Sequence, residues 1–330
     1  MRRLPPAFVL ATNLVVAAGA LGWLLWHHGG EALRLLADHH DPVRLAWFGT
    51  CVAGAVVLLA LRWRVLLAGL GPAPGLARLT AFRAAGQSVS SLVPSGRLGG
   101  DPLRAWMLAS DRVPPAGAIA SVAVDRALEL GAGSGFAVVF AWVLVQHGVP
   151  ALRSSLVTVA LGAVGLAVGF VVSARRLRGG AGLVTAVARG TRLDRLRAVR
   201  DRLATLHKAE DAAARLVEQP RRIGLAFVLG VAAGCVTLVE YWLLLSAFGL
   251  PATPVALAAA IFATGAAHSM PVPAGVGVLE GGQMWLFGLL GHSPDVGLAV
   301  GLAVRFRELC WVVPGLLVLA VRLLGSASES

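Results

Sequence analysis

Charged and polar side chains gather in three groups within otherwise apolar stretches of the chain. Placing an Arg or Asp at the centre of a bilayer costs roughly 2.5–3.5 kcal/mol, so charges kept in apolar segments are expected to serve a purpose. They can tie helices together as ion pairs, or they can contact the polar part of a substrate. The members of the three groups are Arg97, Asp101 and Arg104; Asp125, Arg126 and Glu129; and His268, Glu280, Gln283, Arg305, Arg307 and Glu308.

The first group lies in the segment PSGRLGGDPLR at 94–104, which interrupts an apolar run. Its Pro and Gly residues break a helix and leave backbone groups unpaired, which is tolerated at membrane depth only inside protein or beside a polar cavity. Asp101 precedes Pro102 and can serve as the N-cap of a half-helix. Arg97 and Arg104 can contact a lipid phosphate or pair with carboxylates, and the sequence leaves both interpretations open.

The second group lies about a third of the way into a long apolar run. Arg126 and Glu129 are three residues apart and therefore neighbours on one helix face, while Asp125 and Glu129 are four apart and bring two like charges together. A structural ion pair between helices and a substrate contact are both compatible with this spacing. In the third group, His268 stands beside Ser269. A hydrogen-bonded structural histidine and a proton carrier are the two alternatives there.

The charges of the three groups balance one another. Five arginines stand against five carboxylates: Arg97, Arg104, Arg126, Arg305 and Arg307, and Asp101, Asp125, Glu129, Glu280 and Glu308. A neutral but richly charged cavity suits the polar head of an amphiphile better than a simple ion.

The composition excludes a soluble globular protein. Of the 330 residues, 57% are hydrophobic and 14% charged, and the mean hydropathy is +0.76, whereas soluble domains have roughly 45–50% apolar and about 25% charged residues. The net charge of +12 comes almost entirely from arginine. We interpret it as compositional bias and expect no binding to nucleic acid. Cys51, Cys235 and Cys310 have neither the spacing of a metal site nor that of a disulfide framework.

Long apolar runs predict the elements that must position these charges. A helix needs roughly 20 mostly apolar residues to cross a bilayer. Full spans are expected at 7–26, 45–61, 116–145, 154–173, 223–248 and 297–321, and re-entrant helical hairpins at 79–110 and 255–290. The predicted fold is therefore an all-α polytopic membrane protein, a single membrane domain over 1–330 with about six transmembrane helices plus two re-entrant hairpins.

The basic residues orient the chain. The segment 174–222 holds thirteen basic and five acidic residues, and basic loops stay in the cytoplasm. Both termini are then cytoplasmic and 249–254 is external. Within 174–222, apolar residues recur at three- and four-residue steps and form one face of a helix: Leu193, Leu196, Val199, Leu203, Leu206, Ala209, Ala213 and Leu216. This basic amphipathic helix packs on the bundle or lies on an anionic lipid surface.

The two halves of the chain match at a fixed offset of 179 residues. Pro94, Gly96, Asp101 and Trp106 fall on Pro273, Gly275, Glu280 and Trp285, and Arg126 and Glu129 fall on Arg305 and Glu308. The matching spans cross in opposite directions, so the repeat, 45–145 and 223–321, is inverted. Inverted repeats with broken helices are a recurrent build of transporters whose substrate site lies near the midplane.

The segment GQSVSSLVPSGRLGGDPLRAWMLASDRVPPAGAIASVAVDRALEL, which ends at Leu130, resembles the signature of the lysylphosphatidylglycerol synthase transmembrane, or flippase-like, family. The later PVPAGVGVLEGGQMWLFGLLG and RFREL are similar to that family's second motif, except that Leu279 stands where the family often has arginine. The resemblance covers nearly the whole chain and is closest to the hopanoid-biosynthesis-associated branch. It implies a lipid translocator of the bacterial cytoplasmic (inner) membrane.

A lipid transporter or flippase, which moves a phospholipid or hopanoid-type lipid by alternating access, is the leading hypothesis. Two other classes stay open: a membrane-embedded enzyme or accessory subunit of lipid headgroup biosynthesis, and a scaffold that docks such enzymes through 174–222. HExxH, GxSxG and Walker motifs are absent from the sequence, so no catalytic residue, metal or cofactor is expected. The expected partners are a membrane lipid, an anionic lipid surface at 174–222 and lipid-biosynthesis enzymes.

Overall fold

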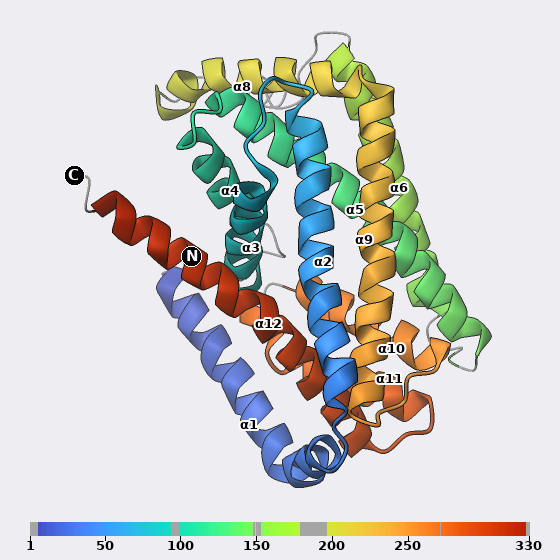
Figure 1. Cartoon of the computed structure of the whole chain (residues 1–330). Helices are drawn as coiled ribbons and strands as arrows, with labels where there is room; N and C mark the ends of the chain where they lie inside the picture. Colours follow the sequence, from blue (N-terminus) through green and yellow to red (C-terminus); the bar gives the residue numbers. More distant parts are fainter. Residues whose placement is uncertain are drawn as a thin grey trace, which may run out of the picture.

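The computed structural model describes residues 6–93, 99–147, 149, 153–178, 197–270 and 272–327. All regular secondary structure in these ranges is helical, which confirms the predicted all-α class. The helices in Figure 1 are α1 (Pro6–Asp38), α2 (Pro42–Leu67), α3 (Leu76–Leu92), α4 (Gly100–Ala109), α5 (Pro115–Gln146), α6 (Arg153–Arg178), α8 (Arg197–Val217), α9 (Pro220–Ala247), α10 (Pro254–Ser269), the short η3 (Pro273–Gly275), α11 (Val278–Leu289) and α12 (Pro294–Ala327).

Four helices are long and apolar enough to cross a membrane, namely α2, α5, α9 and the Leu156–Leu177 part of α6. They correspond to four of the six predicted full spans. The apolar stretch of α6 has no buried residue, as expected of a surface that faces lipid. The protein is therefore a polytopic helical membrane protein. The other two predicted spans, 7–26 and 297–321, fall within α1 and α12, which have 33 and 34 residues.

The helices α2 and α9 lie side by side in the centre of the molecule and run in opposite directions (Figure 1). At one end, the backbone N–H of Asp41 donates to the carbonyl of Ala247 at 2.9 Å. At the other end, Gln219 Nε2 donates to the carbonyl of Gly69 at 3.1 Å. Because α8 lies across this second end (Figure 1), we call the two ends the Asp41 end and the α8 end.

Two helical hairpins, α3–α4 and α10–α11, enter the bundle from opposite ends. The loops before α3 and after α4 border α8, since Gly71, Arg112 and Lys208 line one cleft there. The α10–α11 hairpin begins and ends at the Asp41 end, where Asp295 of α12 lies 2.6 Å from His28 of α1. Inside the bundle, η3 at the tip of the second hairpin contacts α3 of the first. Both hairpins are thus present as pairs of short helices, and their re-entrant course in the membrane stays a prediction.

Helix bounds recur at the 179-residue offset found in the sequence. Shifting α2, α3, α4 and α5 by this offset gives 221–246, 255–271, 279–288 and 294–325, and α9, α10, α11 and α12 begin and end within two residues of these values. Contacts are exchanged between the halves, because α3 packs on α12 while α10 packs on α5, and α1 packs on α12 while α8 packs on α5. Such an exchange is what a two-fold relation between the halves would produce, and the inverted repeat stays a prediction.

The described part of 174–222 supports the predicted amphipathic helix. Ala209 and Leu216 on its apolar face are buried, α8 packs against α5, and Lys208 on the other face is exposed. Leu193 and Leu196 of the predicted face lie outside the described residues. Within the described part, α8 packs on the bundle and turns its basic face outward.

Lys208 offers a direct test of orientation because it is the single lysine of the chain. If the α8 end is cytoplasmic, a membrane-impermeant amine reagent will leave Lys208 unlabelled in intact cells and will label it in inverted vesicles. The variant Lys208→Arg separates its signal from that of the N-terminal amine. Labelling of Lys208 from outside intact cells would reverse the predicted topology.

Candidate functional site

The first site element is a cluster around Asp125 that joins four helices. Asp125 on α5 is fully buried. Its oxygens accept from Arg62 Nε of α2 at 2.7 Å, from Arg83 Nη1 of α3 at 2.7 Å and from Arg104 Nη2 of α4 at 2.6 Å. At most 4% of each of these arginine side chains is exposed. Buried ions are tolerated only with close, well hydrogen-bonded partners, so Asp125 is the point that holds the first hairpin to α2 and α5.

Glu129, one turn further along α5, shares these partners. Arg62 Nη2 donates to Glu129 Oε2 at 3.1 Å, and Arg83 Nη2 donates to the same oxygen. Arg126 Nη1 donates to Glu129 Oε1 at 3.1 Å, so the predicted neighbours Arg126 and Glu129 do meet. Because Arg62 and Arg83 each bridge Asp125 and Glu129, they offset the repulsion expected of two like charges four residues apart.

Asp101 is not the N-cap predicted from the sequence. The helix α4 begins at Gly100, with Gly99 at the cap position, so Asp101 lies in the first turn. Its carboxylate meets Arg104 at 3.3 Å and Arg126 at 3.7 Å instead. The Asp125 cluster thus has four arginines and three carboxylates, a formal charge of +1: Arg62, Arg83, Arg104, Arg126, Asp101, Asp125 and Glu129.

Sequence reasoning misses Arg62 and Arg83. Arg62 directly follows the predicted span 45–61, where an arginine is expected at the membrane interface. Arg83 did carry a usable signal, since it lies inside the apolar run 79–93 and bears the same insertion cost as the charges that were selected.

The second site element is a cluster around Glu280, which is fully buried on α11. Arg305 of α12 binds it in a bidentate manner, with Nε 2.7 Å from Oε1 and Nη2 3.3 Å from Oε2. The backbone N–H of Gly277 donates to Glu280 Oε2 at 2.8 Å and marks the start of α11. Arg305 Nη1 donates to Glu308 Oε2 at 2.8 Å, so the repeat-related pair Arg305 and Glu308 also meets.

Arg305 also fixes the tip of the second hairpin. Its Nη1 donates to the carbonyl of Ala274, a residue whose φ is 51°. This left-handed backbone region is uncommon for residues other than glycine, and strained residues persist where surrounding contacts over-determine them. Gln283 on α11 donates to the carbonyl of Ala260 at 2.9 Å and to Thr264 Oγ1 at 3.2 Å. Gln283 therefore fastens α11 to α10.

His268, near the end of α10, completes the Glu280 cluster. Its Nδ1 lies 2.7 Å from the carbonyl oxygen of Thr264, and its Nε2 lies 2.6 Å from Glu308 Oε1. Only 4% of the His268 side chain is exposed. The Glu280 cluster, defined as His268, Glu280, Arg305 and Glu308, thus ties both arms of the second hairpin to α12.

A third ion pair joins Arg307 of α12 to Glu240 of α9, with Nε 2.7 Å and Nη2 2.6 Å from Glu240 Oε2. Glu240 was not selected from the sequence, although it lies inside an apolar span and, like Arg83, bears the insertion cost of a charge there. With it, six arginines and six carboxylates balance in the described interior: Arg62, Arg83, Arg104, Arg126, Arg305 and Arg307, and Asp101, Asp125, Glu129, Glu240, Glu280 and Glu308. The charges balance as predicted, but this set contains Arg62, Arg83 and Glu240, which were not predicted, and it does not contain Arg97.

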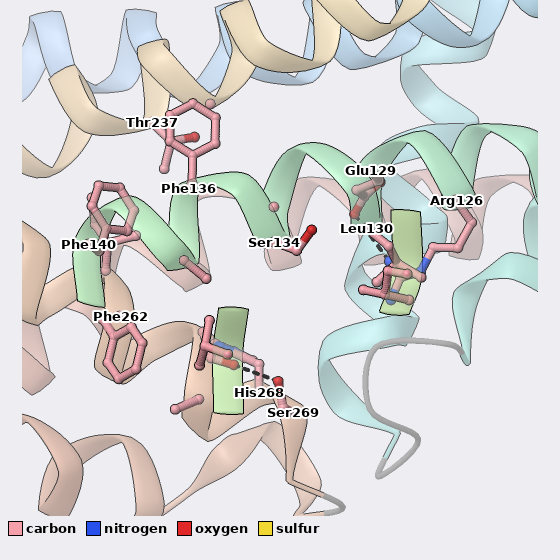
Figure 2. Close-up of a pocket in the computed structure, with 18 residues that line it drawn as sticks. Arg126, Glu129, Leu130, Ser134, Phe136, Phe140, Thr237, Phe262, His268 and Ser269 are labelled. Carbon is pink, nitrogen blue, oxygen red and sulfur yellow. Dashed lines mark hydrogen bonds and ion pairs between the residues drawn. The ribbon is translucent and has the colours of Figure 1, made fainter. Parts of the chain in front are cut away.

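A cavity of about 480 Å³ lies between α5, α6, α9 and α10. Figure 2 shows that its two ends differ: Arg126 and Glu129 of α5 are at one end, and Phe140 of α5 and Phe262 of α10 are at the other. His268 and Ser269 lie on the α10 wall (Figure 2). Val159 and Leu166 of α6 also contribute to the lining. The cavity therefore combines charged groups with an apolar wall.

Three predicted site residues, Arg126, Glu129 and His268, line this cavity. An adjoining cavity of about 230 Å³ shares Glu129 with it and reaches Arg83 and Glu240. Seven other predicted residues hold the lining residues or the hairpins through the contacts above: Asp101, Arg104, Asp125, Glu280, Gln283, Arg305 and Glu308. The remaining one, Arg97, lies outside the described residues.

Comparisons with known proteins agree with this architecture. Residues 10–315 match the family described as "Lysylphosphatidylglycerol synthase TM region". The chain is also 23% identical, over 330 aligned residues, to a UPF0104 membrane protein of Methanothermobacter thermautotrophicus strain Delta H, and the alignment covers 96% of each chain.

Proposed function

Since the chain belongs to the lysylphosphatidylglycerol synthase transmembrane-region family, which implies a lipid-related role in the membrane, we propose that it is a transporter that moves an amphipathic lipid between the leaflets. The observation that carries this proposal is the cavity with charged groups at one end and aromatic groups at the other. Ligand cavities of roughly 300–1,000 Å³ are typical of sites for small molecules, and about 480 Å³ suits a headgroup with the first part of its tail.

In this proposal the headgroup occupies the charged end. Arg126 offers donors to a phosphate or hydroxyl oxygen, and Glu129 offers acceptors to the rest of the headgroup. His268 forms part of the wall beside the headgroup. The tail lies along Phe136, Phe140 and the apolar residues of α6. The other members of the Asp125 and Glu280 clusters position these side chains without contacting the lipid.

The arrangement of the hairpins supports an alternating-access mechanism. The α3–α4 hairpin enters from the α8 end and the α10–α11 hairpin from the Asp41 end, and each is fastened to long helices by its own ion-pair cluster. Rocking of one half against the other exposes the headgroup to each side in turn. The membrane is the bacterial inner membrane with both termini cytoplasmic, and the lipid is a phospholipid or a hopanoid-type lipid.

A cavity-filling variant tests this function. The position of a Cβ at Gly265, on the cavity wall, has no atom within 4 Å, so Gly265→Phe is expected to fold and to obstruct the cavity. In reconstituted vesicles we expect wild type to change the sidedness of a headgroup-labelled lipid without covalent change, and Gly265→Phe to reduce that rate at least about tenfold, the effect of roughly 1.4 kcal/mol lost in substrate binding.

The matched control is Gly54→Phe on α2, where a Cβ also meets open space, and it should keep the wild-type rate. Equal rates for Gly265→Phe and Gly54→Phe would contradict a role of the cavity in transport. A chemically altered lipid after incubation would indicate an enzyme instead of a transporter.

A further inference from the structure

Resting on the proposed function, we infer that His268 and Glu308 together bind one proton, which crosses the membrane with an anionic lipid headgroup. Transport by this chain is then a proton–lipid symport, and the substrate carries a negatively charged phosphate group. The inference follows from the hydrogen-bond geometry of one side-chain pair and from the charges around the cavity between α5, α6, α9 and α10.

The contacts of His268 require a proton between it and Glu308. The Thr264 carbonyl oxygen, 2.7 Å from Nδ1, can only accept, so Nδ1 carries a hydrogen. Nε2 and Glu308 Oε1 lie 2.6 Å apart, and neither atom has another hydrogen-bond partner among the described residues. A neutral imidazole and a carboxylate would place two lone pairs against each other at this distance. The pair therefore holds one proton, which binds from water and returns to water without any other chemical change.

Loss of this proton changes the cavity wall. Glu308 stays in place because its other oxygen accepts from Arg305 at 2.8 Å, so His268 is the partner that separates. His268 lies on α10 and lines the proposed substrate cavity, whereas Glu308 lies on α12. Deprotonation thus releases a direct α10–α12 contact at the wall of the substrate site. The proton state and the shape of the cavity are thereby linked.

The surrounding charges select an anion as the companion of the proton. With the proton bound, His268 and Arg305 balance Glu280 and Glu308, and the Asp125 cluster adds its charge of +1. Without the proton the two clusters sum to zero. An anionic headgroup is attracted to the protonated state, and by linkage its binding favours proton uptake by the same free energy.

The helices α5, α9, α11 and α12, which pack against α10, all contribute charged groups to this balance. They are Arg126 and Glu129 from α5, across the same cavity; Glu280 from α11, bound by Arg305; Arg305, Arg307 and Glu308 from α12; and Glu240 from α9, bound by Arg307. Among these groups in the described part of the chain, the other contacts join an arginine to a carboxylate and form without an added proton. The His268–Glu308 contact forms only when a proton is bound.

The test uses wild type in phosphatidylcholine vesicles that contain fluorescent phosphatidylglycerol. A pH difference of one unit is expected to drive about a tenfold lipid asymmetry at one proton per lipid. An entrapped pH dye should report one proton moved per lipid. Because a proton and a monoanion move together, a potassium diffusion potential should have no effect on the asymmetry. Transport that ignores the pH difference would overturn the inference and leave the proposed function standing.

Variants and a spectroscopic measurement complete the test. His268→Asn and Glu308→Gln should lose the response to the pH difference. His28→Asn should keep it, because His28 forms the same kind of contact, 2.6 Å from Asp295, away from the cavity. Nitrogen-15 NMR of the histidines, assigned with His268→Asn, should show both His268 nitrogens protonated or sharing a proton at neutral pH. An unprotonated Nε2 together with an ionised Glu308 carboxylate in the infrared spectrum would overturn the inference. This result can be obtained even if no lipid moves in any sample, and such a lack of transport would separately refute the proposed function.

Discussion

The substitution Asp125→Ala is expected to destabilise the folded protein by about 3–5 kcal/mol, because it leaves three arginines buried without their shared carboxylate. Arg62, Arg83 and Arg104 donate to Asp125 from three different helices at 2.6–2.7 Å. Loss of the Asp125 carboxylate therefore leaves arginine charge uncompensated in the protein interior, and it also frees the first hairpin from α2 and α5. The change in the free energy of unfolding is measured by thermal or denaturant unfolding of the detergent-solubilised protein.

A surface ion pair supplies the matched control. Arg78 and Asp111 are also 2.7 Å apart, but 61% of the arginine side chain is exposed. Asp111→Ala should cost at most about 1 kcal/mol, the usual value of an exposed pair. If Asp125→Ala and Asp111→Ala destabilised the protein equally, burial would not be the origin of the effect.

The second large effect is expected at Arg305. Arg305→Ala leaves Glu280 and Glu308 as buried carboxylates without their common partner and frees the Ala274 turn. The folded protein should lose roughly 3–5 kcal/mol of stability, and lipid transport should be lost because the second hairpin is no longer fixed to α12. Arg305→Lys should fail almost as badly. A single ammonium does not reproduce the planar fork that reaches Glu280, Glu308 and the Ala274 carbonyl at once.

The control for Arg305→Lys is Arg322→Lys on the same helix. Arg322 donates to the carbonyl of Met107 at 3.2 Å, a contact that lysine can keep, so transport should stay near the wild-type rate. Vesicle transport and membrane insertion are measured in parallel for both variants. Normal transport by well-inserted Arg305→Lys would show that the bidentate contact is dispensable and would remove the Glu280 cluster from the mechanism.

Local patterns in the sequence predict single elements and pairs within one helix, and these predictions agree with the structure. The apolar runs give the helices, and the three-residue spacing gives the pairs Arg126–Glu129 and Arg305–Glu308. The two ion pairs join residues less than one helical turn apart, where helix geometry alone decides which side chains meet.

Contacts between helices were not predictable in the same way. Arg62 reaches Asp125 across 63 positions, and Glu240 reaches Arg307 across 67, so only the packing of the bundle reveals their partners. Asp101 illustrates a competition between rules. Its type and its place before proline favour a cap, but two arginines lie within 3.3–3.7 Å of its carboxylate, and the helix begins one residue earlier.

The exchange of helix partners between the halves bears on how the chain is made. A Cβ at Gly315 of α12 would overlap the Ala84 backbone of α3, so the last helix closes tightly over a helix from the first half. Synthesis runs from the N-terminus, and the N-terminal part folds first. All members of the Asp125 cluster precede residue 130 and are available early. The α3–α4 hairpin nevertheless lacks its packing partner α12 until the ribosome has translated the chain beyond Pro294 and α12 has inserted. During that interval α3 must be shielded from lipid by some other means.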